Sequence, residues 1–162
     1  ALATGYEWIL EIDAGFSHQP SDLPKFIEAM GPDVQCVFGS RFAKGGQVTD
    51  TPWTRRFLSR GGTALTNLLL GTRLSDMTSG YELFRRDVLA RILEHGIESR
   101  AHFFQTEIKY YCRKMKCVEV PIAYQATAEG VAAASVRDAL RHLLRLFGKR
   151  LVSGFVPRRV PS

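Results

Sequence analysis

The chain has 162 residues, the size of one domain, and its 45% hydrophobic and 23% charged residues are typical of a folded protein and exclude global disorder. The net charge of +6 predicts an anionic partner, which is nucleic acid, a phosphorylated small molecule or an anionic membrane surface. No apolar stretch approaches the roughly 20 residues that span a bilayer. The three cysteines form no CxxC pair, which favours buried thiols in a reducing compartment.

The first 50 residues predict an α/β arrangement. Residues 1–5 read as the last turn of a helix with its glycine cap, so the chain is expected to begin partway through a larger fold. Residues 6–12 predict a central strand covered on both faces, because aromatic and β-branched residues occur there without alternation. A short helix over 21–30 and a second strand over 34–39 follow, and this order favours a parallel sheet. The polar stretch 40–50 is expected to be a flexible loop.

The rest of the chain predicts mostly helices. A helix is expected over 53–70, with an apolar face made of Phe57, Leu58, Leu65, Leu68 and Leu69. The next predicted elements are a turn over 76–80, an apolar segment over 81–84, helices over 87–95 and 101–114, and a strand over 117–124. Pro121 within this strand indicates a sheet edge or a bulge.

Asp13 is the first candidate for chemistry, because it stands at the carboxyl end of the first predicted strand, where open α/β sheets bind their ligands. Together with Ser17 and His18 it would ligate a hard divalent cation such as Mg²⁺ or Mn²⁺. A single carboxylate at this position also often caps a turn, and a lone histidine in a turn is more often a hydrogen-bonded surface residue. On spacing alone, the metal site and the turn cap are equally supported.

Basic residues flank the glycine-rich loop that precedes the 53–70 helix. Arg41 stands before this loop, Arg55 and Arg56 follow it, and Ser59 lies one helical turn beyond Arg55. Guanidinium groups on both sides of a loop can clamp a phosphate, and the hydroxyl adds a donor on the same helix face. The alternative is a solvated basic face, which the residues alone slightly favour.

A third polar group opens the helix predicted over 101–114. Gln105 and Glu107 follow two phenylalanines and could present an amide and a carboxylate toward a cleft. Polar residues at a helix start are commonly capping groups instead. Both interpretations stay open at this point.

The last predicted element is a basic amphipathic helix over 135–152. Its basic residues are Arg137, Arg141, Arg145, Lys149 and Arg150. Such a helix can lie in the interface of an anionic membrane, or it can pack on the domain as an ordinary surface helix. Arg158 and Arg159 downstream favour the membrane interpretation.

Six segments match, in order, the pattern of one enzyme family. They are IDAGFSHQP from Ile12, VFGSRFAKGG from Val37, WTRRFLS from Trp53, DMTSGYELFRR from Asp76, FQTE from Phe104 and VEVPI from Val118. Together they resemble family 2 glycosyltransferases, most of all the branch of polyprenyl-phosphate (dolichol-phosphate) mannose synthases. The resemblance runs from about Ala1 to Leu151.

The resemblance implies the C-terminal part of a GT-A fold, a Rossmann-like α/β domain with a mostly parallel sheet, flanking helices and a C-terminal amphipathic helix. It also implies transfer of a sugar from a nucleotide-sugar donor to a polyprenyl phosphate or related lipid acceptor. Asp13 matches the first acid of the family's Asp-x-Asp motif, which holds Mg²⁺ or Mn²⁺ against the diphosphate. Gln105 and Glu107 complete the expected catalytic set.

The acceptor phosphate is expected to bind to basic residues and a hydroxyl. Arg41, Arg55 and Ser59 match the positions that hold acceptor phosphate in the synthases, and Arg56 lies beside them. A phosphate is already a nucleophile at neutral pH, so positioning and charge neutralisation matter more than a general base.

The sequence departs from the family pattern at several places. Gly15 replaces the second acid of Asp-x-Asp, so Ser17 or His18 is expected to contribute instead of the lost acid. The family's Arg-x-x-Gly-x-Ser-Lys pattern is expected near residues 127–133, where only Gly130 is present. The Pro-x-x-Asn-Glu-like start that cradles the nucleotide base does not occur in these residues.

These departures predict the domain organisation and two alternative functions. Residues 1–134 are expected to be a partial GT-A domain without its first nucleotide-binding half, and 135–162 a basic amphipathic helix and tail. The first hypothesis is a metal-dependent glycosyltransferase, inactive as this fragment, that lies peripherally on the cytoplasmic face of the membrane through residues 135–152. The alternative is a non-catalytic binding or scaffold module. Nucleic-acid binding explains the charge but none of the motifs, so no nucleic-acid partner is expected.

Overall fold

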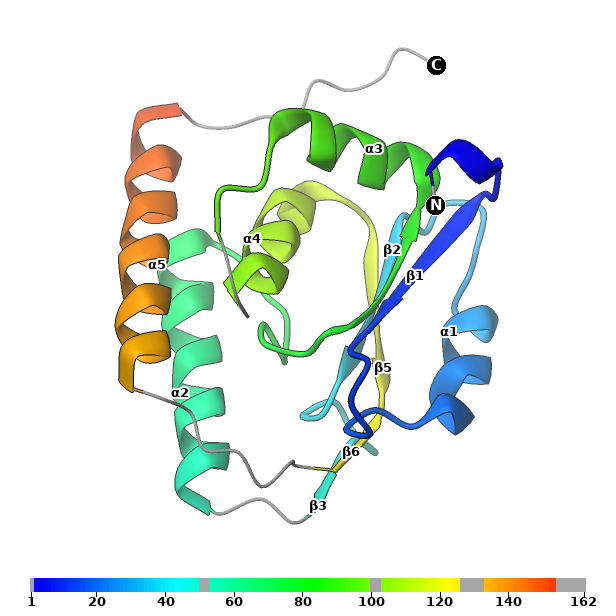
Figure 1. Ribbon diagram of the computed structural model, residues 1–162, viewed down its shortest axis with the longest axis horizontal. Coiled ribbons are helices and arrows are strands. Elements are labelled where there is room, and N and C mark those ends of the chain that lie inside the picture. The colour runs from blue at the N-terminus through cyan, green and yellow to red at the C-terminus, as the bar shows by residue number, and fades with distance from the viewer. Residues whose placement is uncertain (1, 50–52, 100–102, 126–132, 154–162) are drawn as a thin grey trace.

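The computed structural model describes residues 2–49, 53–99, 103–125 and 133–153 (Figure 1). In chain order, the helices and strands are β1 (Trp8–Ile12), α1 (Leu23–Glu28), β2 (Cys36–Ser40), β3 (Gln47–Thr49), α2 (Trp53–Leu70), β4 (Tyr81–Arg85), α3 (Arg86–His95), α4 (Phe103–Tyr111), β5 (Cys117–Pro121), β6 (Ala123–Gln125) and α5 (Ala133–Ser153). Short 3₁₀ turns occupy Leu2–Thr4, Pro20–Asp22 and Cys112–Lys114. All of the predicted helices are present.

Within the described residues, four strands form the main sheet in the order β1-β4-β2-β5. Strands β2 and β5 are parallel, whereas β4 is antiparallel to both of its neighbours, β1 and β2. The expected α/β class is confirmed, and β1, β2 and β5 run in one direction. The sheet is nevertheless mixed, because β4 lies between β1 and β2. Burial explains the position of β4: Tyr81, Leu83 and Phe84 are at most 3% exposed, and such a strand is most stable at the centre of a sheet.

Strand β1 lies at the edge of this sheet, within the part of the chain that the structure describes. Its residues are only partly covered, and Leu10 and Ile12 are exposed. In these residues β1 is therefore a half-covered edge strand rather than the covered central strand that the sequence predicted. An apolar run indicates a strand, but it does not reveal how many neighbours that strand has.

The stretch 40–50, predicted to be a loop, contains the short strand β3, which pairs in parallel with β6. The strand predicted over 117–124 is divided into β5 and β6. Ile122 lies between them and bonds through its backbone to both Ser40 and Gln47. The sheet edge indicated by Pro121 is confirmed, since β5 ends there as an outer strand.

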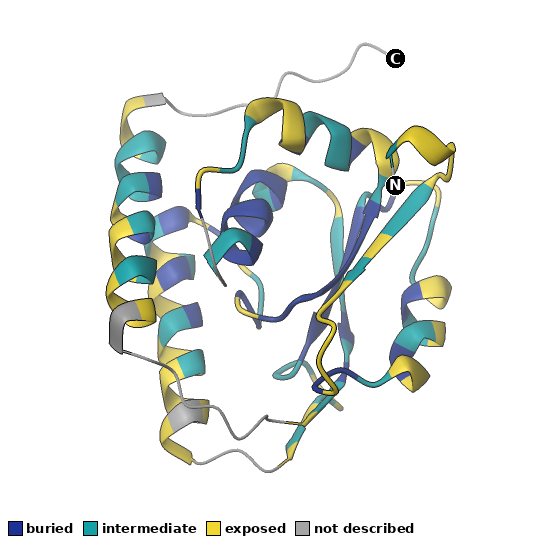
Figure 2. Cartoon of the chain, in the orientation of Figure 1, coloured by how far each residue is buried: buried dark blue, intermediate teal, exposed yellow. Residues whose placement is uncertain are grey.

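The sheet separates two hydrophobic clusters. One lies between the sheet and α1 and includes Phe26, Val37, Tyr81 and Ile122. The other lies on the opposite face and is shared by residues of α2, α3, α4 and α5, such as Leu70, Ile92, Ile108 and Leu146. Figure 1 shows α1 on one side of the sheet and these four helices on the other. In Figure 2, α4 is the most deeply buried helix, and its residues from Gln105 to Tyr111 are all buried.

Helix α2 has the predicted bounds but presents the opposite face to the molecule. Phe57 and Leu68 of the predicted apolar face are 74% and 77% exposed. The inner face instead carries Thr63, Thr66 and the buried Leu70. Hydrogen bonding fixes this orientation, because the Thr63 hydroxyl accepts the backbone N–H of Met77 over 3.2 Å. Four residues of the predicted apolar face, Phe57, Leu58, Leu65 and Leu68, are therefore exposed, and Leu69 alone of that face packs against the core.

Helix α5 confirms the helix predicted over 135–152. Leu143 and Leu146 of α5 are buried in the same cluster as α4, so this helix shares the core of the preceding residues. None of the described helices combines the length and apolar character needed to cross a bilayer.

Candidate active site

Asp13 directly follows β1 and lies against Gly80, which directly precedes β4. The ladder between the two strands ends with Ile12 paired to Tyr81. A Cβ atom at Gly80 would lie 2.7 Å from both carboxylate oxygens of Asp13 and would overlap the Gln105 amide. Only glycine therefore leaves room for the carboxylate and the amide to meet here.

Gln105 in the first turns of α4 holds the Asp13 carboxylate. Its Nε2 donates a hydrogen bond to Asp13 Oδ1 over 3.2 Å. The Gln105 side chain is buried, whereas 47% of the Asp13 side chain is exposed. The carboxylate is thus oriented from inside the molecule and remains accessible to a ligand.

His18 approaches the second oxygen of Asp13. Its Nε2 lies 3.4 Å from Asp13 Oδ2, and its side chain is 1% exposed. The ring packs against Tyr81 and Tyr124, with centroid distances of 5.4 and 5.3 Å. Neither ring nitrogen has a hydrogen-bond partner among the described residues. A bound cation would satisfy such a buried nitrogen beside a carboxylate.

Ser17 and Gly15 complete the turn after β1. Ser17 is buried, and its carbonyl oxygen accepts the backbone N–H of Gln125 over 2.9 Å, which attaches the turn to β6. A Cβ atom at Gly15 would make only an ordinary contact of 3.7 Å with the Ser17 hydroxyl. Steric crowding therefore does not explain the absence of the family's second acid at position 15.

Two more carboxylates lie on the same face of the sheet as Asp13. Glu11 precedes Asp13 by two residues, and Glu82 is the cross-strand partner of Glu11, so the three side chains point the same way. Lys109 of α4 lies opposite them, with its Nζ 3.1 Å from Glu82 Oε1. The same Nζ donates a hydrogen bond to the carbonyl oxygen of Ser79 over 2.7 Å. Lys109 thus neutralises part of the negative charge of Glu11, Asp13 and Glu82, which together form a carboxylate row.

Burial raises the pKa values of two carboxyl groups in the carboxylate row. It raises the pKa of Glu82 to about 8, although the charge of Lys109 acts in the opposite direction. Burial and the charge of Asp13 raise the pKa of Glu11. Glu11, Glu82 and Lys109 were not predicted from the sequence. The available signals were the charges within apolar strands and the four-residue spacing of Lys109 from Gln105, which puts both on one helix face.

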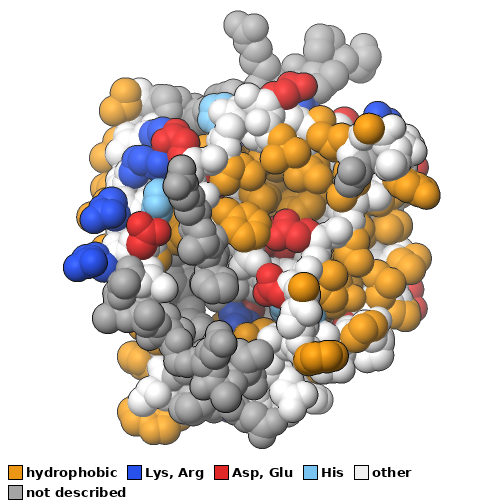
Figure 3. All heavy atoms as spheres, viewed as in Figure 1, with side chains coloured by type: hydrophobic (Ala, Val, Ile, Leu, Met, Phe, Trp, Pro, Cys, Tyr) orange, Lys and Arg blue, Asp and Glu red, His pale blue; other side chains and the backbone are white. Residues whose placement is uncertain are grey.

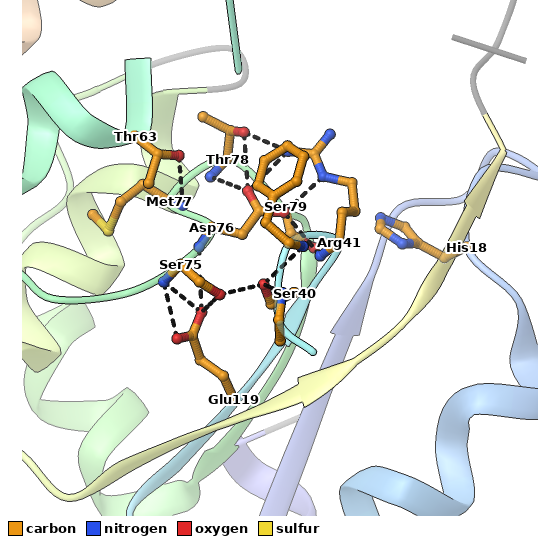
Figure 4. Close-up of polar contacts among 12 residues, drawn as sticks. His18, Ser40, Arg41, Thr63, Ser75, Asp76, Met77, Thr78, Ser79 and Glu119 are labelled. Atoms are coloured by element: carbon orange, nitrogen blue, oxygen red, sulfur yellow. Dashed lines mark hydrogen bonds and ion pairs between the residues drawn. The ribbon is translucent and has the colours of Figure 1, made fainter. Parts of the chain in front are cut away.

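Arg41, at the carboxyl end of β2, is paired with Asp76 (Figure 4). Its Nε and Nη2 donate to the two carboxylate oxygens over 2.7 and 2.8 Å, and Nη2 also donates to the Thr78 hydroxyl. Burial raises the pKa of Asp76, but the hydrogen bonds and charge of Arg41 outweigh it and lower the pKa to about 2. The guanidinium expected to hold phosphate is therefore already bound to a buried carboxylate, and the Arg41 side chain is only 10% exposed.

The turn that carries Asp76 is fixed to β2 and β5. Glu119 of β5 accepts the backbone N–H and the hydroxyl of Ser75 over 2.9 and 2.8 Å, and the Ser75 hydroxyl lies 2.6 Å from that of Ser40 (Figure 4). These bonds hold the Asp76 carboxylate against the Arg41 guanidinium. This support could not be predicted from the sequence, because its members come from three distant segments.

Tyr124 of β6 connects the Asp13 and Arg41 groups. Its ring packs against His18, and its centroid lies 5.0 Å from the guanidinium carbon of Arg41. Burial lowers the pKa of Arg41, but Asp76, Tyr124 and Asp13 outweigh it and raise the pKa. The sequence-predicted metal residues and the first phosphate residue therefore share one electrostatic environment. Tyr124 itself was not predicted.

The other residues predicted to bind acceptor phosphate are Arg55, Arg56 and Ser59. Arg56 is exposed and Ser59 is half-buried, whereas the side chain of Arg55 lies outside the described structure. Arg60, one helical turn after Arg56, places its guanidinium carbon 5.0 Å from the ring centroid of Phe42. Phe42 directly follows Arg41, so this contact ties the first turns of α2 to the Arg41 loop.

Glu107 does not share a cleft with Gln105, because residues two apart on a helix point in nearly opposite directions. Its carboxylate accepts the backbone N–H of Ser99 over 2.7 Å and the hydroxyl of Tyr111 over 3.0 Å, and Arg145 of α5 lies 3.5 Å away. Burial raises the pKa of Glu107, but these hydrogen bonds outweigh it and lower the pKa. The structure brings Gln105 to Asp13 and leaves Glu107 between α4 and α5.

The donor set around Asp13 fits an open divalent-cation site. Among the described residues, no three His, Cys, Asp or Glu side chains gather as a closed metal cluster. Mg²⁺ typically binds one or two carboxylates and completes its shell with water and phosphate oxygens. An exposed carboxylate beside an imidazole whose nitrogens make no hydrogen bond in the described structure suits an ion shared with a phosphorylated ligand. The residues near the expected Arg-x-x-Gly-x-Ser-Lys position, including Gly130, lie outside the described structure.

Sequence comparisons relate the chain to lipid-phosphate mannosyltransferases. Residues 1–93 match the family model described as "Glycosyl transferase family 2". The polyprenol monophosphomannose synthase of Mycolicibacterium smegmatis is 33% identical over 144 residues, covering 86% of this chain and 54% of that protein. The undecaprenyl-phosphate mannosyltransferase of Micrococcus luteus is 36% identical over 125 residues, covering 76% of this chain and 51% of that protein. The chain therefore spans about half the length of these relatives.

A solved structure has a similar fold. It is the glucosyl-3-phosphoglycerate synthase of Mycobacterium tuberculosis in complex with uridine diphosphate, with a TM-score of 0.63 and 17% identity over 90% of this chain and 51% of that one. This likeness concerns the fold and confirms the GT-A architecture implied by the resemblance. Since the family model covers more than half of the residues, the chain belongs to glycosyl transferase family 2.

Proposed function

We propose that this chain carries the metal-binding and acceptor-binding elements of a glycosyltransferase that moves a sugar from a nucleotide-sugar to a lipid phosphate. The observation that carries the proposal is the meeting of Asp13, Gln105 and His18 beside Arg41, with Tyr124 between the two groups. The names of the relatives support a polyprenyl phosphate as acceptor and mannose as the first sugar to test. The uridine diphosphate in the similar solved structure supports a nucleoside-diphosphate donor.

We propose Mg²⁺ or Mn²⁺ as the cofactor. Asp13 would supply a carboxylate oxygen, His18 a ring nitrogen and Ser17 a hydroxyl. When bound, the ion would neutralise charge on the nucleoside diphosphate that leaves the sugar. Gln105 keeps the Asp13 carboxylate oriented toward this position by its hydrogen bond.

The protein residues would mainly position two anionic reactants. An acceptor phosphate is ionised at neutral pH and does not need a strong general base. Arg41, fixed by Asp76, would supply positive charge near the reacting groups, and Arg56 and Ser59 would bind the acceptor phosphate with Arg55. Glu107 acts as a positioning residue in this proposal, because it joins the start of α4 to the preceding loop through Ser99.

We also propose that the protein acts at the cytoplasmic face of the membrane, bound peripherally through residues 135–152. The support for this location is chemical. A polyprenyl phosphate remains in the bilayer, so the transferase must come to the lipid surface, and the exposed Arg137 and Arg141 suit anionic headgroups.

Sugar transfer in detergent, measured with the full-length protein, tests the proposed function. GDP-mannose and UDP-glucose are offered as donors with a short-chain polyprenyl phosphate and Mn²⁺. We expect Arg56→Ala to raise the KM for the acceptor about 10-fold, the loss of roughly one charge-assisted hydrogen bond, and to leave the KM for the donor unchanged.

Arg73→Ala is the matched control, since Arg73 is an exposed arginine just beyond α2. It should leave both KM values unchanged. Absence of transfer from either donor, with no metal-dependent nucleotide binding, would contradict the proposal and favour the non-catalytic module.

A further inference from the structure

Strand β6 lies between the two groups of the candidate site and is bonded to both. Its residue Tyr124 forms an isolated antiparallel bridge with His18, and Gln125 donates its backbone N–H to the Ser17 carbonyl oxygen over 2.9 Å. On its other side β6 pairs with β3, which begins six residues after Arg41. The turn that carries His18 and the loop that follows Arg41 therefore meet on this one strand.

The backbone around Tyr124 is also fixed by two side chains. The buried carboxylate of Asp22, just before α1, accepts the backbone N–H of Ala123 over 2.8 Å. The hydroxyl of Thr49 in β3 donates to the carbonyl oxygen of Tyr124 over 3.3 Å. The backbone of Tyr124 is thus held from β3, from the start of α1 and from the turn after β1, which makes its ring a fixed wall of the site.

Two aromatic rings determine the direction of the His18 imidazole. A histidine that binds a metal usually donates a hydrogen bond from its other ring nitrogen, and this bond fixes the ring. Neither nitrogen of His18 has such a partner among the described residues, and the side chain is 1% exposed. The imidazole instead packs edge-to-face with Tyr124 and is tilted against Tyr81. Packing against these rings therefore keeps Nε2 directed toward Asp13.

The same tyrosine ring also contacts the guanidinium of Arg41. The guanidinium carbon lies over the ring, 5.0 Å from its centroid, which is within the range of a cation–π contact. Asp76 binds one edge of the guanidinium through Nε and Nη2. Contact with the ring limits rotation of the guanidinium about that edge, so Asp76 and Tyr124 together determine its orientation.

We propose that Tyr124 is a positioning residue for both halves of the site, with one ring that directs the His18 imidazole and the Arg41 guanidinium. The inference rests on the proposed function, since it takes a divalent cation at Asp13 and a phosphate near Arg41. Tyr124 acts through these two neighbours. A single side chain then determines how the cation and the acceptor phosphate lie relative to each other, and sugar transfer depends on this alignment.

Two other roles of an aromatic ring at this position have different consequences. Loss of a ring that only packs would destabilise the fold and leave the binding constants of the folded protein unchanged. Loss of a ring that stacks on the nucleotide base would change the KM for the donor and leave acceptor binding unchanged. Shared positioning predicts paired losses, one at the cation and one at the acceptor.

Replacement of Tyr124 by leucine and by phenylalanine in the full-length protein tests this role. Tyr124→Leu removes the ring, whereas Tyr124→Phe removes only the hydroxyl. We expect Tyr124→Leu to weaken Mn²⁺ binding in the presence of nucleotide at least about 10-fold, as is usual when a group that orients a metal ligand is lost. Electron paramagnetic resonance of free Mn²⁺ measures this affinity without any turnover.

The acceptor gives the second measurement. At saturating Mn²⁺, we expect Tyr124→Leu to raise the KM for a short-chain polyprenyl phosphate about 5-fold, the loss of one cation–π contact. Tyr124→Phe should keep the Mn²⁺ affinity and this KM within about twofold of the parent, because the ring makes both contacts. If circular dichroism shows that Tyr124→Leu is unfolded, Tyr124→Met removes the ring with a more adaptable side chain.

Tyr6→Leu is the matched control, since Tyr6 is 70% exposed and precedes β1. It should leave the Mn²⁺ affinity and the acceptor KM unchanged. Unchanged values in Tyr124→Leu would overturn the proposal, and so would losses of equal size in Tyr124→Phe. An effect on only one of the two values, or on the donor KM alone, would overturn it as well.

The parent protein separates this inference from the proposed function. Transfer by the parent with no effect of Tyr124→Leu would overturn the positioning role and leave the proposed function in place. A parent that neither binds nucleotide with Mn²⁺ nor transfers sugar would contradict both.

Discussion

At the residue scale, the candidate site depends on a glycine that faces a carboxylate. Gly80 leaves the space in which Gln105 reaches Asp13. Asp13 and Gln105 could both be proposed from the sequence, because one ends a strand and the other begins a helix. The requirement for glycine at position 80 could not be proposed from the sequence, because it depends on how β4 lies beside β1. A glycine in a turn gives the same sequence signal whether it provides flexibility or space.

Replacing Gly80 with alanine tests this arrangement. The added methyl group would collide with the Asp13 carboxylate and the Gln105 amide, so we expect a loss of about 1–3 kcal/mol in the free energy of unfolding. Urea unfolding measures this change. Gly61→Ala is the control, because nothing lies within 4 Å of its added methyl group on the exposed side of α2. It should stabilise the protein by about 0.4–1 kcal/mol. Equal stability of the two variants would contradict the account.

At the scale of elements, helix α4 determines how the site is built. Its inner face places Gln105 against Asp13 and Lys109 against Glu82, four residues apart on one side of the helix. Glu107 points away for the same reason, and the sequence missed this because a two-residue spacing looks close in the printed chain. Helix periodicity alone would have separated Glu107 from Gln105.

The orientation of α2 could not be predicted from the periodicity of its apolar residues. Its apolar residues predicted one apolar face, but the hydrogen bond between Thr63 and Met77 and the packing of Leu70 turn the opposite face toward the core. An apolar stripe facing water and one facing the core have the same periodicity. The sequence could therefore predict the bounds of the helix but not the direction in which it faces.

The contact between α4 and β4 predicts a pH dependence of stability. Burial raises the pKa of Glu82 to about 8, above the value near 4.5 expected in the unfolded chain, while Glu11, Asp13 and Lys109 contribute charge around it. The native state then holds the proton more tightly, so the contribution of Glu82 is complete below pH 4.5 and is lost as the pH rises toward 8.

Glu82→Gln removes this titration. We expect the variant to gain stability relative to the parent between pH 5 and pH 8, by more than about 1.4 kcal/mol, the equivalent of one pKa unit. Urea unfolding at several pH values gives the difference. A difference that stays constant over this range, or that changes in the opposite direction, would show that Glu82 is ionised in the native protein.

At the scale of the whole molecule, the candidate site lies at one end of the sheet, where β1 and β2 have their carboxyl ends. Strands β1 and β2 run in the same direction, so their carboxyl ends bring Asp13 and Arg41 to this end of the sheet. Strand β4 runs the other way, and the turn before it delivers Asp76 and Gly80 to the same place. The sequence predicted the class of fold and the residues at the strand ends. It did not predict the antiparallel strand between them, because strand pairing across 40 or more residues leaves no local pattern.

The molecule also divides its charge. In Figure 3 some acidic side chains lie near the middle of the face, and most basic side chains lie along the edge formed by α5, with acidic side chains among them. An anionic nucleotide at the carboxylate row requires a counter-cation, whereas an anionic lipid surface binds α5 directly. The proposed cation would therefore bind one anionic ligand at the carboxylate row, and the basic helix surface would bind the other directly.

Binding of Mn²⁺ in the presence of GDP or UDP tests whether Asp13 holds a divalent cation. Electron paramagnetic resonance of free Mn²⁺ gives its affinity for the parent chain, for Asp13→Asn, and for Asp33→Asn as a control that removes an exposed carboxylate elsewhere. We expect Asp13→Asn to weaken nucleotide-dependent Mn²⁺ binding by about 10–100-fold, the usual loss for a disrupted metal site, and Asp33→Asn to leave it unchanged. Equal Mn²⁺ affinity in all three proteins would contradict a metal site at Asp13.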